Sequence, residues 1–240
     1  GSEMCIRDRP KSLKKPALRC AGEATNRALV RFRRPNAGCG GSFWGPACPV
    51  ASFKGTALRI HHLNCGTDCP LGGALFDGRS VSPFGTIVGH CLLIETDAHG
   101  LVLVDTGFGL RDVAHPHASP DPRVPRPWRA MLNIQLRERE TAIRQIEALG
   151  YDAADVRHIV VTHLDFDHAG GLEDFPAATV HVMQREYDDA TSPHEGFVAR
   201  NRWRPPQLNG VAEWRCYSAP GEPWFGFDAV RGLVGLPPEI

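Results

Sequence analysis

The chain contains the segment Thr162-His163-Leu164-Asp165-Phe166-Asp167-His168-Ala169-Gly170-Gly171. Four side chains of the kinds that bind metal ions fall within six residues of it, namely His163, Asp165, Asp167 and His168. The apolar run before them predicts a buried strand, and the two glycines after them predict a tight turn. Imidazole and carboxylate ligands suit zinc, iron or manganese, so the segment predicts a catalytic metal site. The alternative is a polar loop whose Asp residues cap the next helix.

This segment resembles the His-x-His-x-Asp-His loop of the metallo-β-lactamase superfamily, with Asp165 where that family has its second His. Upstream, Leu101-Val102-Leu103-Val104-Asp105-Thr106-Gly107 resembles the strand of the same family that ends in Asp-Thr-Gly. The resemblance covers roughly residues 58–240. It implies an α/β fold, an αβ/βα sandwich of the metallo-β-lactamase type.

The resemblance also implies a cofactor, two divalent metal ions that share a water or hydroxide. His163 and Asp165 would then hold the first ion, and Asp167 and His168 the second. Asp167 would also act in catalysis, by orienting that water or passing on its proton. Asp105 would lie beneath the loop and accept the free N–H of a ligating His. Zinc is the commonest metal of this scaffold, but the hard, charged carboxylate of Asp165 favours iron or manganese and a less acidic water.

The family supplies further ligands downstream, including a His in a Gly-His-Thr-like segment, an Asp and a final His. The histidines after His168 are His181, in a predicted strand, and His194, in a proline-flanked loop. His194 is an alternative ligand. We therefore expect residues 56–240 to be the N-terminal portion of such a domain, incomplete at the C-terminus.

The charge distribution sets residues 1–55 apart. They hold 11 Lys and Arg against 3 Asp and Glu, whereas residues 56–240 hold 16 against 24. The basic part is broken by prolines and has no apolar period, so we expect a disordered or non-native N-terminal arm. One alternative is that this arm tethers nucleic acid. The net charge of −8 over residues 56–240 disfavours nucleic acid as a substrate.

No run of about 18 apolar residues and no signal peptide are evident in the sequence, so we expect no membrane partner and a cytoplasmic location. No feature indicates an oligomeric state. Cys91 falls in an apolar strand, which is typical of a reduced, buried thiol. Cys65 and Cys69 follow His61 and His62 closely enough that a separate structural zinc is an alternative to a simple loop there.

The remaining pattern predicts a first strand over 57–62 and a long loop to residue 84. Strands follow over 86–95, 101–105, 157–162 and 179–183, with helices over 137–149 and 185–189. Residues 115–127 are proline-rich and predict an exposed loop, which makes His115 and His117 weak ligand candidates. The last forty residues are rich in aromatics, which favours either a surface loop on the sheet or an apolar substrate wall.

These features favour a metal-dependent hydrolase that acts by water attack on an ester-like bond of a small molecule. A lactone or carboxylic ester is the preferred substrate, by analogy with the quorum-quenching lactonases of this fold, which the chain resembles. Thioesterase, phosphodiesterase and di-iron redox functions are alternatives within the fold. The alternative from another class is a non-catalytic fragment or metal-poor binding domain, which the missing downstream ligands favour.

Overall fold

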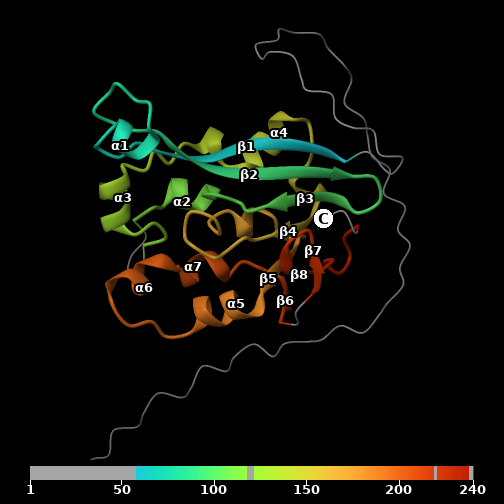
Figure 1. The fold of residues 1–240 in the computed structure, drawn as a ribbon. Helices are drawn as coiled ribbons and strands as arrows, with labels where there is room; N and C mark the ends of the chain where they lie inside the picture. The colour runs from blue at the N-terminus through green and yellow to red at the C-terminus, as the bar shows by residue number, and fades with distance from the viewer. Residues whose placement is uncertain (1–57, 118–121, 219–220, 238–239) are drawn as a thin grey trace, which may run out of the picture. The chain divides into compact units, whose positions relative to one another are not determined.

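The computed structural model describes residues 58–117, 122–218, 221–237 and 240. Its centre is a six-stranded mixed sheet in the order β1-β2-β3-β4-β5-β6 (Figure 1). Its strands are β1 (Arg59–Asp68), β2 (Ile87–Thr96), β3 (Gly100–Val104), β4 (Val156–Val160), β5 (Thr179–Met183) and β6 (Glu213–Tyr217). Strands β1 to β3 pair antiparallel, and β3 to β6 pair parallel. The predicted arm of residues 1–55 lies outside the described residues.

Short helices connect these strands, which confirms the predicted α/β class. The helices are α1 (Ala74–Asp77), α2 (Leu110–Ala114), α3 (Arg126–Leu132), α4 (Ala142–Ala148), α5 (Gln184–Thr191), α6 (Phe197–Arg202) and α7 (Pro205–Leu208). Among these described elements, no helix has the length and apolar character needed to cross a membrane. The predicted helix over 137–149 is divided. A 3-10 turn at Glu138–Glu140 comes first, and α4 starts after Thr141.

The core lies mainly on one face of the sheet. Leu93 of β2, Leu103 of β3 and Ile159 of β4 are completely buried there, together with Ile146 of α4. Strand β3 is buried on both faces, as the central strand of a sheet is expected to be. The carboxyl ends of β3 and β4, which pair parallel, therefore emerge side by side from the buried centre of the sheet.

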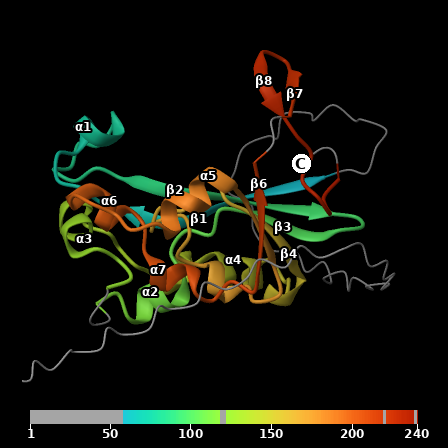
Figure 2. The same cartoon turned by 90° about the horizontal axis from the view of Figure 1, so that it is seen from below.

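Two sequence predictions were wrong at the edges of the sheet. Strand β1 does not end at His62 but continues to Asp68. Its continuation is stabilised by the burial of Cys65 and by β2, which pairs with β1 on both sides of a bulge between Asn64 and Thr67. The last forty residues are not a plain loop either. They add β6 to the sheet and then form a hairpin of β7 (Glu222–Trp224) and β8 (Phe227–Val230), which stands apart from the sheet in Figure 2.

Candidate metal centre

The ligand loop, defined here as residues 162–171, begins just after β4 ends and is bonded to the segment that follows β3. The N–H of Asp105 donates to the carbonyl of Val160 at 3.0 Å, and the N–H of Thr106 donates to the carbonyl of His168 at 3.0 Å. The N–H of Gly171 donates to the carbonyl of Gly107 at 3.2 Å. These backbone bonds fix the loop over two neighbouring strand ends, so its side chains are presented at one edge of the sheet.

The two glycines of the loop are required by close packing. A Cβ on Gly171 would lie 3.1 Å from the Thr106 Cβ atom, and one on Gly170 would overlap the Asp112 carboxylate. That carboxylate is completely buried and pairs with the Arg123 guanidinium, whose Nε lies 2.7 Å from Oδ1. Gln207 donates to Asp112 at 3.1 Å and to the carbonyl of Phe166 at 2.9 Å. The buried polar network of Asp112, Arg123 and Gln207 thus holds the ligand loop in place.

Asp105 is bonded to two residues of the ligand loop, Thr162 at its start and His168. Its Oδ1 accepts the Thr162 N–H at 2.8 Å, and its Oδ2 lies 2.7 Å from the Thr162 hydroxyl and 3.0 Å from Nδ1 of His168. The backbone of Asp105 is left-handed, with φ of 56°, a conformation that costs an L-residue roughly 1–2 kcal/mol. The carboxylate is thereby aimed at His168, whose Nε2 is left to face the outside of the loop.

The pKa of His168 reflects this environment. Burial alone would lower the pKa, but the bond to Asp105 and the charges of Asp167, Asp105 and Asp165 raise it above its ordinary value. The imidazole therefore lies in a field that attracts positive charge, whether a proton or a metal ion.

The structure brings the four predicted ligands together in two pairs. The rings of His163 and His168 are 4.0 Å apart. His163 Nε2 lies 3.8 Å from Asp165 Oδ2, and His168 Nε2 lies 3.7 Å from Asp167 Oδ2. Two ligand atoms about 2.1 Å from one tetrahedral ion stand roughly 3.4 Å apart, so each pair fits a shared ion after a small adjustment.

A complete centre needs more than these pairs. Across the described ranges, no three His, Cys, Asp or Glu side chains converge closely enough to hold an ion by themselves. The donor set of each pair, one imidazole and one carboxylate, fits a divalent metal. It leaves open coordination positions for water, substrate or further ligands.

Asp165 has a partner that sequence reasoning missed. Its Oδ1 lies 2.5 Å from Nε of Arg202, at the end of α6. Burial raises the pKa of Asp165 above its usual range, while Arg202 and His163 oppose that shift. Arg202 follows Asp165 by 37 residues and belongs to no motif, so no signal in a single sequence could have identified it.

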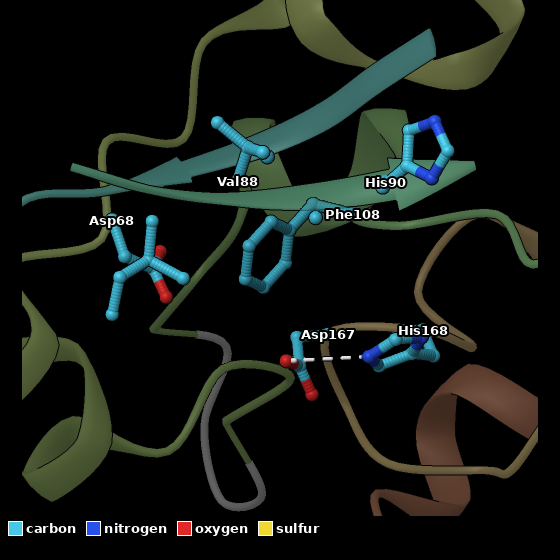
Figure 3. Close-up of a pocket in the computed structure, with 9 residues that line it drawn as sticks. Asp68, Val88, His90, Phe108, Asp167 and His168 are labelled. Carbon is cyan, nitrogen blue, oxygen red and sulfur yellow. Dashed lines mark ion pairs between the residues drawn. The ribbon is translucent and has the colours of Figure 1, made fainter. Parts of the chain in front are cut away.

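A cavity of about 320 Å³ opens beside Asp167 and His168 (Figure 3). Its apolar wall consists of Ile87, Val88 and Phe108, and Asp68 and His90 add polar groups. Burial and the charge of Asp167 raise the pKa of Asp68 to about 7. Oδ1 of Asp68 is buried without a hydrogen-bond partner. Asp68 was not predicted as a site residue, because sequence reasoning ended β1 six residues before it.

The other predicted candidates lie elsewhere. His181 is on β5, where its Nε2 is 3.0 Å from His158 Nδ1 and its Nδ1 is 2.7 Å from the Tyr217 hydroxyl. His194 stacks on the Trp203 ring with centroids 4.4 Å apart. His117 bonds Arg129.

The alternative of a structural zinc near Cys65 and Cys69 is not supported. His61 bonds Glu95 at 2.6 Å, and His62 bonds His90 at 2.9 Å. Cys65 is buried in the core.

Comparison with known families and proteins places these features in context. The family model of the metallo-beta-lactamase superfamily matches residues 85–238. A probable metallo-hydrolase of Mycobacterium tuberculosis is 42% identical over 183 residues, which are 76% of this chain and 53% of that protein. An N-acyl homoserine lactonase of Azorhizobium caulinodans is 40% identical over 158 residues, 62% of this chain and 56% of that protein. The chain spans about half the length of these curated relatives.

A solved structure also matches this chain. It is a mutant of the Bacillus thuringiensis lactonase with N-decanoyl-L-homoserine bound at its active site, and the match has a TM-score of 0.48 and 19% identity. The match covers 70% of this chain and 62% of that one.

Proposed function

The chain belongs to the metallo-β-lactamase superfamily, and on that premise we propose that it is part of a metal-dependent hydrolase acting on a lactone or another carboxylic ester. The ligands proposed are His163 and Asp165 for one divalent ion, and Asp167 and His168 for a second. The proposed metal is zinc, with iron and manganese as alternatives. The proposed substrate is a small molecule, because residues 56–240 carry a net charge of −8 and would repel a polyanion.

The observation that carries this proposal is the position of His168 between two carboxylates. Asp105 lies 3.0 Å from Nδ1, so it holds the imidazole in the tautomer that leaves Nε2 without a proton. Asp167 Oδ2 lies 3.7 Å from that Nε2, and both residues line the cavity (Figure 3). Bound divalent ions lower the pKa of water and polarise a carbonyl oxygen.

Asp167 is proposed to act on the proton in this arrangement. Its side chain is the more exposed of the pair, at 39% against 25% for His168, and it lines the cavity. A carboxylate there can accept a proton from the attacking water and return it to the leaving alcohol. Asp105 contributes indirectly, by holding a proton on Nδ1 of His168 and fixing the orientation of the ring.

The cavity favours an ester with an apolar substituent. Ile87, Val88 and Phe108 form a wall on the side of Asp167 and His168, and 320 Å³ is about the lower limit for a small-molecule site. The sequence offered the aromatic residues of the last forty positions as a substrate wall. Of these, Trp203 and Tyr217 are buried, whereas Trp224, Phe225 and Phe227 are exposed on the β7–β8 hairpin. The relative named as an N-acyl homoserine lactonase supports a lactone substrate.

The lack of a third convergent ligand among the described residues favours a second candidate, a metal-poor binding domain of the same fold. A cytoplasmic location is proposed because Cys65, Cys69, Cys91 and Cys216 are all free thiols.

Hydrolysis of a lactone series separates the two candidate functions. Zinc-loaded protein should open lactones that differ in acyl length, and His168→Ala should lose at least about 100-fold in kcat/KM. His115→Ala, at an exposed position, is the matched control and should keep full activity. Equal rates of hydrolysis by His168→Ala and His115→Ala, or no hydrolysis by the wild type, would reject the proposed hydrolase function in favour of the binding domain.

A further inference from the structure

Arg202 connects α6 to the ligand loop through both its backbone and its side chain. The carbonyl of Arg202 accepts the Phe166 N–H at 3.1 Å, and the next residue, Trp203, forms an isolated β-bridge with Asp165. The guanidinium Nε lies 2.5 Å from Asp165 Oδ1. Arg202 therefore contacts the one ligand position of the loop motif at which this chain departs from the family pattern.

The Arg202 guanidinium is itself held from two other sides. Its Cζ lies 4.5 Å above the Trp203 ring, and its Nη2 lies 3.9 Å from Oε1 of Glu186 on α5. The same Glu186 oxygen accepts the Leu164 N–H at 2.9 Å. It also accepts the Trp203 indole N–H at 3.0 Å. The charge next to Asp165 is thus fixed in place, unlike that of a freely moving surface arginine.

The two oxygens of Asp165 have different surroundings. Oδ1 is bonded to Arg202, whereas Oδ2 faces Nε2 of His163 at 3.8 Å. A carboxylate held through one oxygen can present the other as a single-atom ligand, as an imidazole does with one nitrogen. The negative charge that distinguishes aspartate from neutral histidine is offset by the adjacent guanidinium.

We propose that Arg202 is a positioning residue that makes Asp165 an electrically neutral substitute for the second histidine of the family motif. The Asp165–Arg202 pair then occupies one ligand position with no net charge. This inference rests on the proposed metal centre. It also reverses an expectation from the sequence, because Asp165 so paired does not shift the site toward iron or manganese or make its water less acidic.

The test compares Arg202→Gln with Arg202→Lys and with the double substitution Asp165→His/Arg202→Gln. Arg200→Gln is the matched control, because Arg200 is exposed on the same helix and, among the described residues, its guanidinium bonds a backbone carbonyl, that of His194, and no carboxylate. Each protein is loaded with Co²⁺ for its visible absorption spectrum. Each is then assayed with zinc across pH 5 to 10.

Arg202→Gln should move the acidic limb of the pH–kcat/KM profile up by about one pH unit, because the lost positive charge is bonded directly to the proposed ligand Asp165. It should also change the Co²⁺ spectrum. Arg202→Lys should restore most of the pH profile, and the double variant should match the pH profile of the wild type while its Co²⁺ spectrum shows that the ion is bound. Unfolding by urea identifies any variant that fails to fold, and the double variant, which needs no ion pair, still provides the test.

The outcomes separate this inference from the function on which it rests. A wild type that binds Co²⁺ and hydrolyses lactones, with Arg202→Gln unchanged in spectrum and profile, leaves the hydrolase intact and overturns the role of Arg202. A double variant as impaired as Arg202→Gln also overturns it. A wild type that binds no Co²⁺ overturns the metal centre and the inference together.

Discussion

Oδ2 of Asp105 lies 3.0 Å from Nδ1 of His168, although the two residues are 63 positions apart in the chain. The contact exists because β3 and β4 are adjacent and parallel, so residues just beyond their carboxyl ends meet. The left-handed backbone of Asp105 turns its carboxylate into the ligand loop. This relationship links the sheet to the proposed chemistry.

Asp105→Asn should weaken zinc binding by about 10- to 100-fold, because an uncharged amide no longer favours the required tautomer of His168. Asparagine tolerates the left-handed backbone, so the fold should survive the change. Zinc affinity is measured by competition with a chromogenic chelator. Asp97→Asn, in the exposed β2–β3 turn, is the control. An Asp105→Asn affinity equal to that of the control would contradict the proposed role.

Arg123→Met should destabilise the fold by about 3–5 kcal/mol, because it leaves the buried Asp112 carboxylate without its partner. The Arg123 side chain is 3% exposed and that of Asp112 is completely buried, so water cannot replace the lost pair. Urea unfolding measures the loss. Arg126→Met, at the exposed start of α3, should change stability by less than about 0.5 kcal/mol. Equal effects of the two changes would show that the network is not needed.

Stability should fall in acid because of His158 and His181. Burial lowers the pKa of His181 to about 4 and also lowers that of His158. Between pH 6.5 and 4 the unfolded chain therefore binds more protons than the folded one, and stability decreases as the pH falls. For His181 alone, the loss between pH 7.5 and 5.5 should be roughly 1 kcal/mol. His181→Gln should reduce this slope, whereas a slope identical to that of the wild type would exclude His181 as its source.

Asp68→Asn should stabilise the chelator-treated protein in alkali but not in acid. The folded pKa of about 7 exceeds the ordinary value of 3.8, so the folded state holds a proton that the unfolded state releases. Stability is therefore lost as the pH rises from about 4 through 7. The melting temperature of Asp68→Asn should exceed that of the wild type at pH 8.5 and match it at pH 5. The reverse order would mean that Asp68 has a compensating partner.

Local sequence pattern predicted the strands that are apolar throughout and the loop that joins a strand to two glycines. Strand β5, Thr179–Met183, has the predicted bounds, and Asp105 lies where the Asp-Thr-Gly element placed it. Pairing across the sheet was harder to predict. Strand β1 continues through Gly66 only because β2 lies beside it, and tertiary pairing overrides the weak strand propensity of glycine.

Polar contacts between distant segments could not be predicted from one sequence. Arg202 and Asp165, or Arg123 and Asp112, are ordinary charged residues until folding brings them together. Their positions depend on where α6 and the segment before α3 lie in space, which no local period encodes. Strand β6 was missed for a related reason, because its partly buried residues show little apolar alternation.

The central claim is that the ligand loop holds metal, and counting metal per chain tests it most directly. Protein is loaded with zinc, desalted and analysed by inductively coupled plasma mass spectrometry, together with His163→Ala and His168→Ala. We predict about two zinc ions per wild-type chain and one fewer in each variant, since each His belongs to a different pair. Trace zinc in the wild type, or equal zinc in all three proteins, would contradict the claim.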